Sequence, residues 1–173
     1  MYLLPKPKTI KEQDGQMLLC HSTHIVMTKE VAETEMHAAK RLQEAIRQET
    51  GLILPFSVGE VREGDLSLGI VKTLPEQTYE ITIDEKGGQI SGGDGAGVLY
   101  GVETFCQIVQ QCGGILPCVQ IQDAPDMPNR GYYFDQTRGR VLKLEKLKKI
   151  ADRMSRYKLN QLQLYVEHTY LFR

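Results

Sequence analysis

Side chains that could bind a ligand gather near the carboxyl end of this chain, around two short apolar runs. Arg130 precedes the first run, Asp135 and Arg138 follow it, and Glu167 and His168 follow the second run. A guanidinium presents several N–H donors in a fixed fork, which suits oxygen acceptors. A carboxylate and an imidazole at the end of a strand suit the recognition of hydroxyl groups. These five residues are therefore the candidate ligand contacts.

Each candidate also has a structural explanation. Arg130 can be paired with Asp126 or with another carboxylate nearby, which would use its donors internally. Asp135 and Arg138 stand three residues apart, so an ion pair that fixes the loop competes with ligand contact. Glu167 and His168 can simply be exposed to solvent, as Glu usually is. The residue types alone leave these alternatives open.

Metal and cofactor sites are not expected. The histidines His21, His24 and His37 show no metal-ligand spacing with one another or with the cysteines, and no C-x-x-C pair occurs. The Gly-rich segment 92–95 matches neither phosphate-binding glycine motif. We therefore expect no metal, no cofactor and four reduced cysteines that behave as small apolar residues.

Composition places the chain among globular proteins and disfavours two classes of partner. The 173 residues are 41% hydrophobic and carry a formal net charge of -1, so no positive field attracts nucleic acid or an anionic membrane. No apolar run approaches the length that spans a bilayer, and the first residues, MYLLPKPK, do not resemble a signal peptide. The expected location is the cytoplasm.

Residues 1–127 are expected to form one α/β (α+β) domain, a mixed sheet covered by two helices. One helix is predicted for residues 29–50, ended by Gly51 as a C-cap, and another begins after Asp94 as its N-cap. The alternating segment YEITID followed by QISG predicts a hairpin and hence an antiparallel part of the sheet. The expected strands are residues 3–5, 16–19, 23–28, 52–58, 66–71, 79–84, 89–92 and 115–122.

Residues 128–173 carry the pattern of a strand, a helix and a second strand. GYYFDQT and NQLQLYV read as strands and LEKLKKIADRMSRYK as an amphipathic helix, a unit whose strands pair in parallel. The segment DAPDMPN separates this pattern from the first domain. A lone unit of this kind leaves strand edges and apolar faces uncovered, so we expect further chain beyond Arg173. For residues 1–173 without that further chain, we expect a homodimer that forms through residues 128–173.

Five segments together resemble a known family: PKPKTIKEQDG, TGLILP, GGDGAGVLYGVETFCQIV, IQDAPDMPNRGYYFDQTRGRV and YKLNQLQLYVEHTY. In this order they resemble the non-catalytic N-terminal domain of glycoside hydrolase family 20, the β-N-acetylhexosaminidases. The last two resemble the first strand, first helix and second strand of that family's (β/α)8 TIM barrel. The D-x-x-R after Arg130-Gly131 favours family 20 over the O-GlcNAcase and α-glucuronidase families, whose barrels follow a similar accessory domain.

The resemblance implies an activity and places its chemistry. Family 20 enzymes remove terminal N-acetylhexosamine from glycans with retention, using the substrate's own acetamido oxygen as the nucleophile. Their catalytic Asp-Glu pair lies on a later barrel strand, beyond Arg173 here, so residues 1–173 alone are expected to be inactive. Arg130 matches a family arginine that binds sugar hydroxyls; Asp135 and Arg138 rank second.

The second strand departs from the family pattern. Gln163 and Tyr165 stand where histidines are usual, and His168 falls where the first of two aspartates would stand. Glu167 is the nearest carboxylate, so substrate preference is left open.

A competing hypothesis is a non-catalytic carbohydrate-binding or scaffolding module with a docking tail. The hydrophobic pattern of residues 131–166 argues against it, because a linker would be polar or rich in Pro, Ser and Gly.

Overall fold

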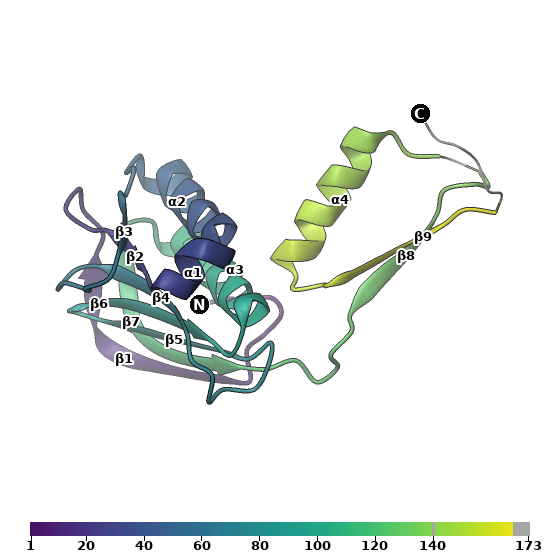
Figure 1. Ribbon diagram of the computed structural model, residues 1–173. Helices are drawn as coiled ribbons and strands as arrows, with labels where there is room; N and C mark the ends of the chain where they lie inside the picture. Colours follow the sequence, from purple (N-terminus) through teal and green to yellow (C-terminus); the bar gives the residue numbers. More distant parts are fainter. Residues whose placement is uncertain (140, 168–173) are drawn as a thin grey trace. The chain divides into compact units, whose positions relative to one another are not determined.

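A computed structural model describes residues 1–139 and 141–167 of the chain (Figure 1). The chain divides into two compact units, Met1–Asp126 and Met127–Arg173. The first unit contains ten elements: β1 (Thr9–Leu18), β2 (Ile25–Met27), α1 (Lys29–Thr34), α2 (Met36–Thr50), β3 (Phe56–Val58), β4 (Leu66–Ile70), β5 (Tyr79–Asp84), β6 (Gly87–Gly92), α3 (Gly95–Cys112) and β7 (Ile115–Asp123).

The strands of the first unit form one mixed seven-stranded sheet, which confirms the predicted sheet type. Its order is β1-β7-β5-β6-β4-β2-β3. The pairs β1–β7, β7–β5 and β5–β6 are antiparallel, while β6–β4, β4–β2 and β2–β3 are parallel. The hairpin of β5 and β6 is the one that the alternating segment predicted.

One face of this sheet is apolar because side chains alternate along each strand. The register places one residue of each strand in a continuous row across the sheet, namely Ile10, Ile121, Ile81, Ile90, Leu68, Met27 and Val58. The three helices lie on one side of the sheet (Figure 1). Residues of the row and of the helices, among them Ile81 and Phe105, share one buried core. The adjacent row, with Gln120, Thr82 and Gln89, is polar.

The predicted caps are confirmed, but the predicted first helix is two helices. Gly51 ends α2 in the left-handed conformation, with φ 76°, and Asp94 Oδ1 accepts a hydrogen bond from Gly97 N at 2.7 Å. The chain breaks at Glu35, whose ψ of 23° lies outside helical values. The Glu35 carboxylate packs against Gly95 at the start of α3, where a β-carbon would collide with it. A carboxylate is favourable at a helix N-terminus. Because the apolar spacing continues through Glu35, the periodicity of the sequence does not reveal the break between the two helices.

Two strand predictions were also wrong in extent. Residues 3–5 are not a strand; β1 begins at Thr9 and is polar and largely exposed, because it forms an edge of the sheet. Within residues 52–58 only Phe56–Val58 pair as β3. Leu54 is buried but lies outside β3, so its apolar side chain indicated a core position and not membership of a strand.

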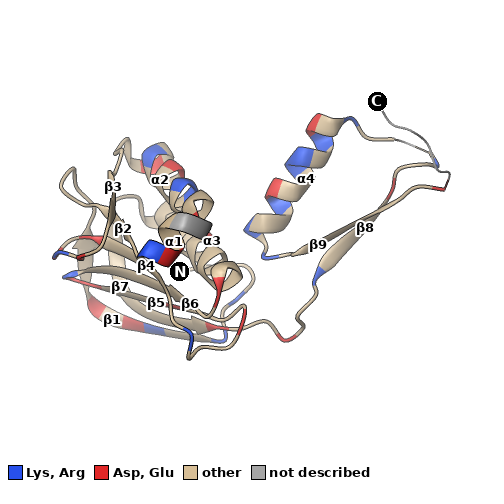
Figure 2. Ribbon diagram, viewed as in Figure 1, with Lys and Arg blue, Asp and Glu red and all other residues tan. Residues whose placement is uncertain are grey.

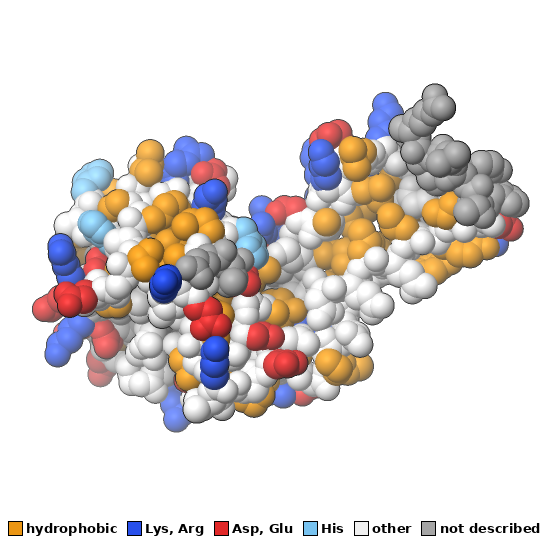
Figure 3. All heavy atoms as spheres, viewed as in Figure 1, with side chains coloured by type: hydrophobic (Ala, Val, Ile, Leu, Met, Phe, Trp, Pro, Cys, Tyr) orange, Lys and Arg blue, Asp and Glu red, His pale blue; other side chains and the backbone are white. Residues whose placement is uncertain are grey.

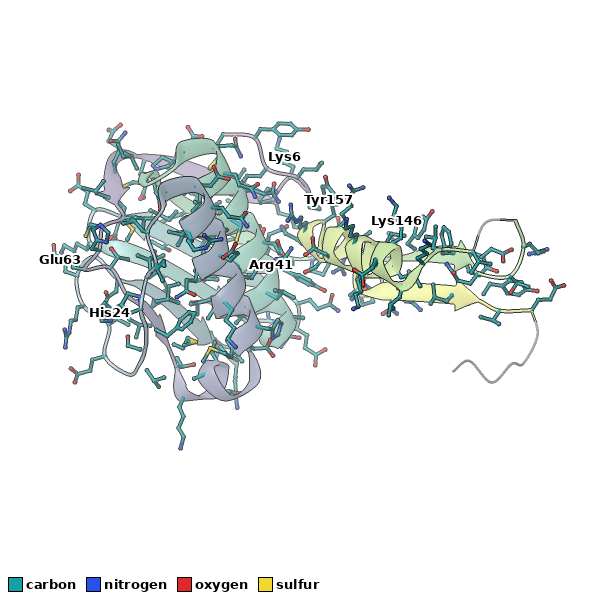
Figure 4. All side chains as sticks on the ribbon, turned by 90° about the horizontal axis from the view of Figure 1, so that it is seen from above. Lys6, His24, Arg41, Glu63, Lys146 and Tyr157 are labelled. Atoms are coloured by element: carbon teal, nitrogen blue, oxygen red, sulfur yellow. The ribbon has the colours of Figure 1, made fainter. Side chains whose placement is uncertain are left out.

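The second unit contains β8 (Gly131–Asp135), α4 (Leu144–Arg156) and β9 (Gln161–Tyr165). The two strands pair in parallel, as the strand–helix–strand pattern predicted, with Tyr133 opposite Gln163. Charged residues are spread along α4 (Figure 2), and the Lys146 side chain extends from it into solvent (Figure 4). The predicted apolar face of α4 is only partly covered: Met154 is buried, whereas Leu144 is 64% exposed.

Candidate functional site

The carboxyl ends of β8 and β9 bring together most of the candidate residues. Parallel strands end at the same edge of a sheet, and alternate residues share a face. Tyr132 and Phe134 are in ring contact, as are Tyr133 and Tyr165, so odd-numbered and even-numbered residues occupy opposite faces. The even-numbered face is apolar, and the odd-numbered face carries Asp135 at its end.

Asp135 and Arg138 form the internal ion pair that was one of the two alternatives. Asp135 Oδ1 accepts from the backbone N–H of Thr137 at 2.8 Å and of Arg138 at 2.9 Å, and Oδ2 accepts from Arg138 Nε at 2.9 Å. The N–H groups of Arg138 and Thr137, with the guanidinium, lower the pKa of Asp135. The hydrogen bond to Asp135 raises the pKa of Arg138. Both groups are therefore held in their charged forms.

Tyr165 and Thr137 complete this cluster, and neither was among the five candidate contacts predicted from the sequence. The Arg138 guanidinium lies 5.1 Å from the centre of the Tyr165 ring, within range of a cation–π interaction. The backbone N–H of Glu167 donates to Thr137 Oγ1 at 2.8 Å, which fixes Glu167 next to the loop that carries Arg138. Two-residue alternation along each strand could have placed residues 137 and 165 on the face of Asp135.

Arg130 lies at the opposite end of β8 and has backbone partners. Its Nε and Nη2 donate to the carbonyl of Lys158 at 3.0 and 2.8 Å, and Nη1 donates to those of Met127 and Pro128 at 2.7 and 3.2 Å. Asp126, the carboxylate considered as its alternative partner, instead pairs with Lys8 at 2.7 Å. The Arg130 fork thus ties the entry of β8 to the loop after α4.

The arrangement can bind a polar ligand at the ends of the strands, with a cation, carboxylates and an aromatic ring. Asp135, Arg138 and Glu167 are brought together there; Arg130 is not, and His168 lies outside the described residues. Among residues 1–139 and 141–167, no three His, Cys, Asp or Glu side chains are grouped so that they could hold a metal ion. None of the helices described is long and apolar enough to cross a membrane.

Comparison with known proteins gives one consistent family. The profile of "Glycosyl hydrolase family 20, domain 2" matches residues 1–124. The β-hexosaminidase of Porphyromonas gingivalis is 29% identical over 171 residues, which are 92% of this chain and 22% of that protein. The β-hexosaminidase of Akkermansia muciniphila is 33% identical over 124 residues, 70% of this chain and 23% of that protein. The chain thus spans about a quarter of the length of these relatives.

Solved structures give the same result for the fold. The β-N-acetylhexosaminidase of Streptomyces coelicolor, from family 20, superimposes with a TM-score of 0.81 at 22% identity, over 94% of this chain and 34% of that one. The family 20 exo-β-N-acetylglucosaminidase of Vibrio harveyi, solved with N-acetylglucosamine, gives a TM-score of 0.78 at 22% identity, over 94% of this chain and 25% of that one. Since the domain profile alone covers well over half of the residues, this chain belongs to glycoside hydrolase family 20.

Proposed function

We propose that this chain is the N-terminal part of a retaining β-N-acetylhexosaminidase that removes terminal N-acetylhexosamine from glycans by substrate-assisted catalysis. Membership of family 20 supports the activity, since its matched relatives are β-hexosaminidases. In this proposal residues 1–127 are the accessory domain, and residues 128–173 are the first strand, helix and second strand of a (β/α)8 barrel. The chain covers about a quarter of the matched relatives, so most of the barrel would lie in the remainder.

The observation that carries this proposal is the parallel pair β8–β9 with polar side chains at its carboxyl ends. Enzymes built on (β/α)8 barrels place their chemistry at that end of the strands. Asp135, Arg138 and Glu167 occupy it, next to an apolar even-numbered face that a ring of helices would cover. The carboxylate pair that performs catalysis would follow Arg173, which makes residues 1–173 inactive by themselves.

We propose that Arg138, rather than Arg130, donates to sugar hydroxyls. Arg138 stands at the carboxyl end of β8, oriented by Asp135 and by the Tyr165 ring. Arg130 stands at the amino end and donates to three backbone carbonyls. We therefore assign Arg138, Asp135 and Glu167 to the substrate side of the barrel and Arg130 to holding the first strand in place.

Hydrolysis of a chromogenic aryl N-acetyl-β-glucosaminide tests the proposal. Residues 1–173 should release no chromophore, whereas a full-length enzyme that contains this sequence should cleave the substrate. In that enzyme Arg138→Ala should leave the fold intact and lower kcat/KM by at least about a hundredfold, because the substrate loses several charge-assisted hydrogen bonds. Arg130→Lys should instead reduce thermal stability. Cleavage by residues 1–173 alone would place the catalytic groups within this chain and overturn the proposal.

Self-association through the second unit is proposed for residues 1–173 alone. Tyr132, Leu144 and Leu164 are 49, 64 and 42% exposed, and hydrophobic side chains remain visible on the surface of this unit (Figure 3). Exposed strand edges and apolar faces favour association. Light scattering should give the mass of a dimer, and Leu144→Lys should shift it to the monomer; a monomer at every concentration would exclude the association.

A further inference from the structure

A polar pocket lies at the β3 edge of the sheet, within the first unit. Two of its lining residues belong to β3, one directly precedes β2, and three lie in the loop that joins β3 to β4. The pocket has a volume of about 280 Å³ and is lined by His24, Ser57, Val58, Glu60, Arg62 and Asp65. A pocket of this size fits a small ligand or one unit of a longer one.

The loop that lines the pocket, residues 59–65, has a fixed backbone. Gly59 N donates to the last carbonyl of β2 at 3.2 Å. Asp65 is 4% exposed, and its two carboxylate oxygens accept from the backbone N–H groups of His24 and Arg62, both at 2.9 Å. Because Asp65 holds both residues in place before any ligand arrives, less conformational freedom is lost on binding.

The polar side chains around the pocket, in contrast, have no partners of their own. Across residues 1–139 and 141–167, no hydrogen bond or ion pair engages the side chains of His24, Ser57, Glu60 or Arg62. Binding residues are commonly carried on loops that a rigid scaffold positions. A fixed backbone with unpaired polar side chains is therefore the arrangement of a binding site that is ready for its ligand.

The lining favours a neutral ligand with several hydroxyl groups. The Arg62 guanidinium only donates hydrogen bonds, the Glu60 carboxylate only accepts them, and the His24 imidazole can do both. Because the carboxylates of Glu60 and Asp65 stand beside one guanidinium, the pocket offers an anion little net attraction. A hydroxyl group donates and accepts at once, so a sugar unit with adjacent hydroxyls can satisfy the guanidinium and the carboxylate together.

We propose that this pocket is a second sugar-binding site, separate from the candidate site of the second unit. Its ligand is one neutral sugar unit of a glycan, hydrogen-bonded by Arg62, Glu60 and His24. Val58, which is 56% exposed, offers an apolar surface to the C–H groups of the sugar ring. None of the residues described around the pocket is aromatic, so the affinity for one unit is low, in the millimolar range.

A weak site of this kind holds a long glycan on the enzyme by raising its local concentration. The choice of a glycan as the source of the sugar rests on the proposed hydrolase function, whereas the geometry of the pocket does not.

NMR titration of residues 1–173 with N-acetylglucosamine tests the site without any hydrolysis. The side-chain signals of Arg62 and His24 and the backbone amide signal of Ser57 should shift until they saturate. Acetamide, which carries the amide group of this sugar without its hydroxyls, should leave them unchanged at the same concentration. Equal shifts with acetamide, no shifts at all, or shifts confined to Arg138 in the second unit would each refute a sugar site in this pocket.

Two carboxylates on the same loop give a matched pair of variants. Glu60 lines the pocket and Glu63 does not, although Figure 4 shows Glu63 at the same end of the first unit as His24. Arg62→Ala should raise the dissociation constant at least about tenfold, because charge-assisted hydrogen bonds are lost while the backbone N–H that Asp65 binds is kept. Glu60→Ala should weaken binding too, and Glu63→Ala should leave it unchanged. Unweakened binding in Arg62→Ala, or an equal loss in Glu63→Ala, would overturn the proposal.

A full-length enzyme that contains this sequence separates the pocket from the proposed activity. Arg62→Ala should leave kcat/KM for the small aryl N-acetyl-β-glucosaminide unchanged, and should lower kcat/KM for a long glycan of the same sugar at least about threefold. An equal effect on both substrates, or none on the long glycan, would contradict a role in holding glycans. If the full-length enzyme cleaves neither substrate, the hydrolase proposal fails, while the titration of residues 1–173 still decides whether the pocket binds sugar.

Discussion

The two units of the chain carry similar apolar patterns but bury them to different extents. In the first unit Ile81 and Phe105 are fully buried, and seven strands with three helices on one side close a continuous core. Among residues 127–139 and 141–167 of the second unit, Met154 is the one hydrophobic side chain that is buried. Leu144 and Leu164 are 64 and 42% exposed. An apolar pattern thus shows which face needs cover and leaves open whether the same stretch of chain supplies it.

The largest expected difference between the units lies in core substitutions. Ile81→Ala should lower the free energy of unfolding by about 4 kcal/mol, because Ile81 lies within the apolar row with no exposure. Leu164→Ala on β9 should cost below about 1 kcal/mol, since that side chain is already partly in water. Urea denaturation followed by circular dichroism measures both. Equal costs would show that the second unit has a closed core of its own.

Buried charge should give the next largest effect. Arg41 on α2 forms an ion pair with Glu103 on α3, and Glu103 is 3% exposed. Arg41→Ala should lower the free energy of unfolding by about 3 kcal/mol, because it leaves a buried carboxylate without its cation. Adding Glu103→Gln should restore part of that loss. In the same urea experiment Arg47→Ala should hardly change the midpoint, because its pair with Glu44 is exposed; a comparable loss there would contradict the role of burial.

The fold of the first unit could be predicted where local chemistry and burial agree. Asp94 before a glycine-rich helix start and Gly51 after an amphipathic stripe marked real helix ends. The break at Glu35 could not be predicted, because the apolar spacing continues through it and the contact that Glu35 makes is with Gly95, sixty residues later in the chain. Of the edge strand β1 only the carboxyl end was predicted, as residues 16–19, because the preceding polar residues offer no apolar alternation to read.

The candidate site was predicted less well, for a similar reason. Asp135, Arg138 and Glu167 were identified by residue type and position, and the structure brings them together. The backbone partners of Arg130 belong to the loop after α4, so no local pattern shows that its donors are used. Tyr165 was noted only as a departure from histidine, whereas its ring lies against the guanidinium of Arg138.

Helix capping offers a smaller and more direct comparison of the units. Asp94 caps α3 and also accepts from Gln77 N at 3.0 Å, whereas the side chain of Lys143, at the N-cap of α4, makes no capping hydrogen bond. Asp94→Ala should lower the free energy of unfolding by about 1 to 2 kcal/mol. Lys143→Ser should raise the stability of α4 by about 0.5 kcal/mol, measured as helical ellipticity against temperature. A stabilising effect of Asp94→Ala would show that the cap is dispensable.

The smallest expected effect is a pH dependence confined to the second unit. The pKa of Asp135 in the folded chain lies below its usual value of 3.8, chiefly through the N–H groups of Arg138 and Thr137. A lowered carboxyl pKa stabilises the fold above that usual value, and the contribution is lost as pH falls through the folded pKa. Acidification below 3.8 should therefore loosen the loop at the end of β8.

Titration of the Asp135 carboxyl carbon by NMR measures this shift and divides it between its causes. Arg138→Ala removes the guanidinium and keeps the backbone N–H groups, so the Asp135 pKa should rise only part of the way to its usual value. Glu44 in the first unit, whose pKa the hydrogen bonds from Arg47 and Gln48 lower to about 2, should not respond and serves as the control. A complete return of the Asp135 pKa in Arg138→Ala would mean that the side-chain ion pair, rather than the turn of the backbone, holds this carboxylate ionised. The loop would then depend on the same guanidinium that is proposed to contact the substrate.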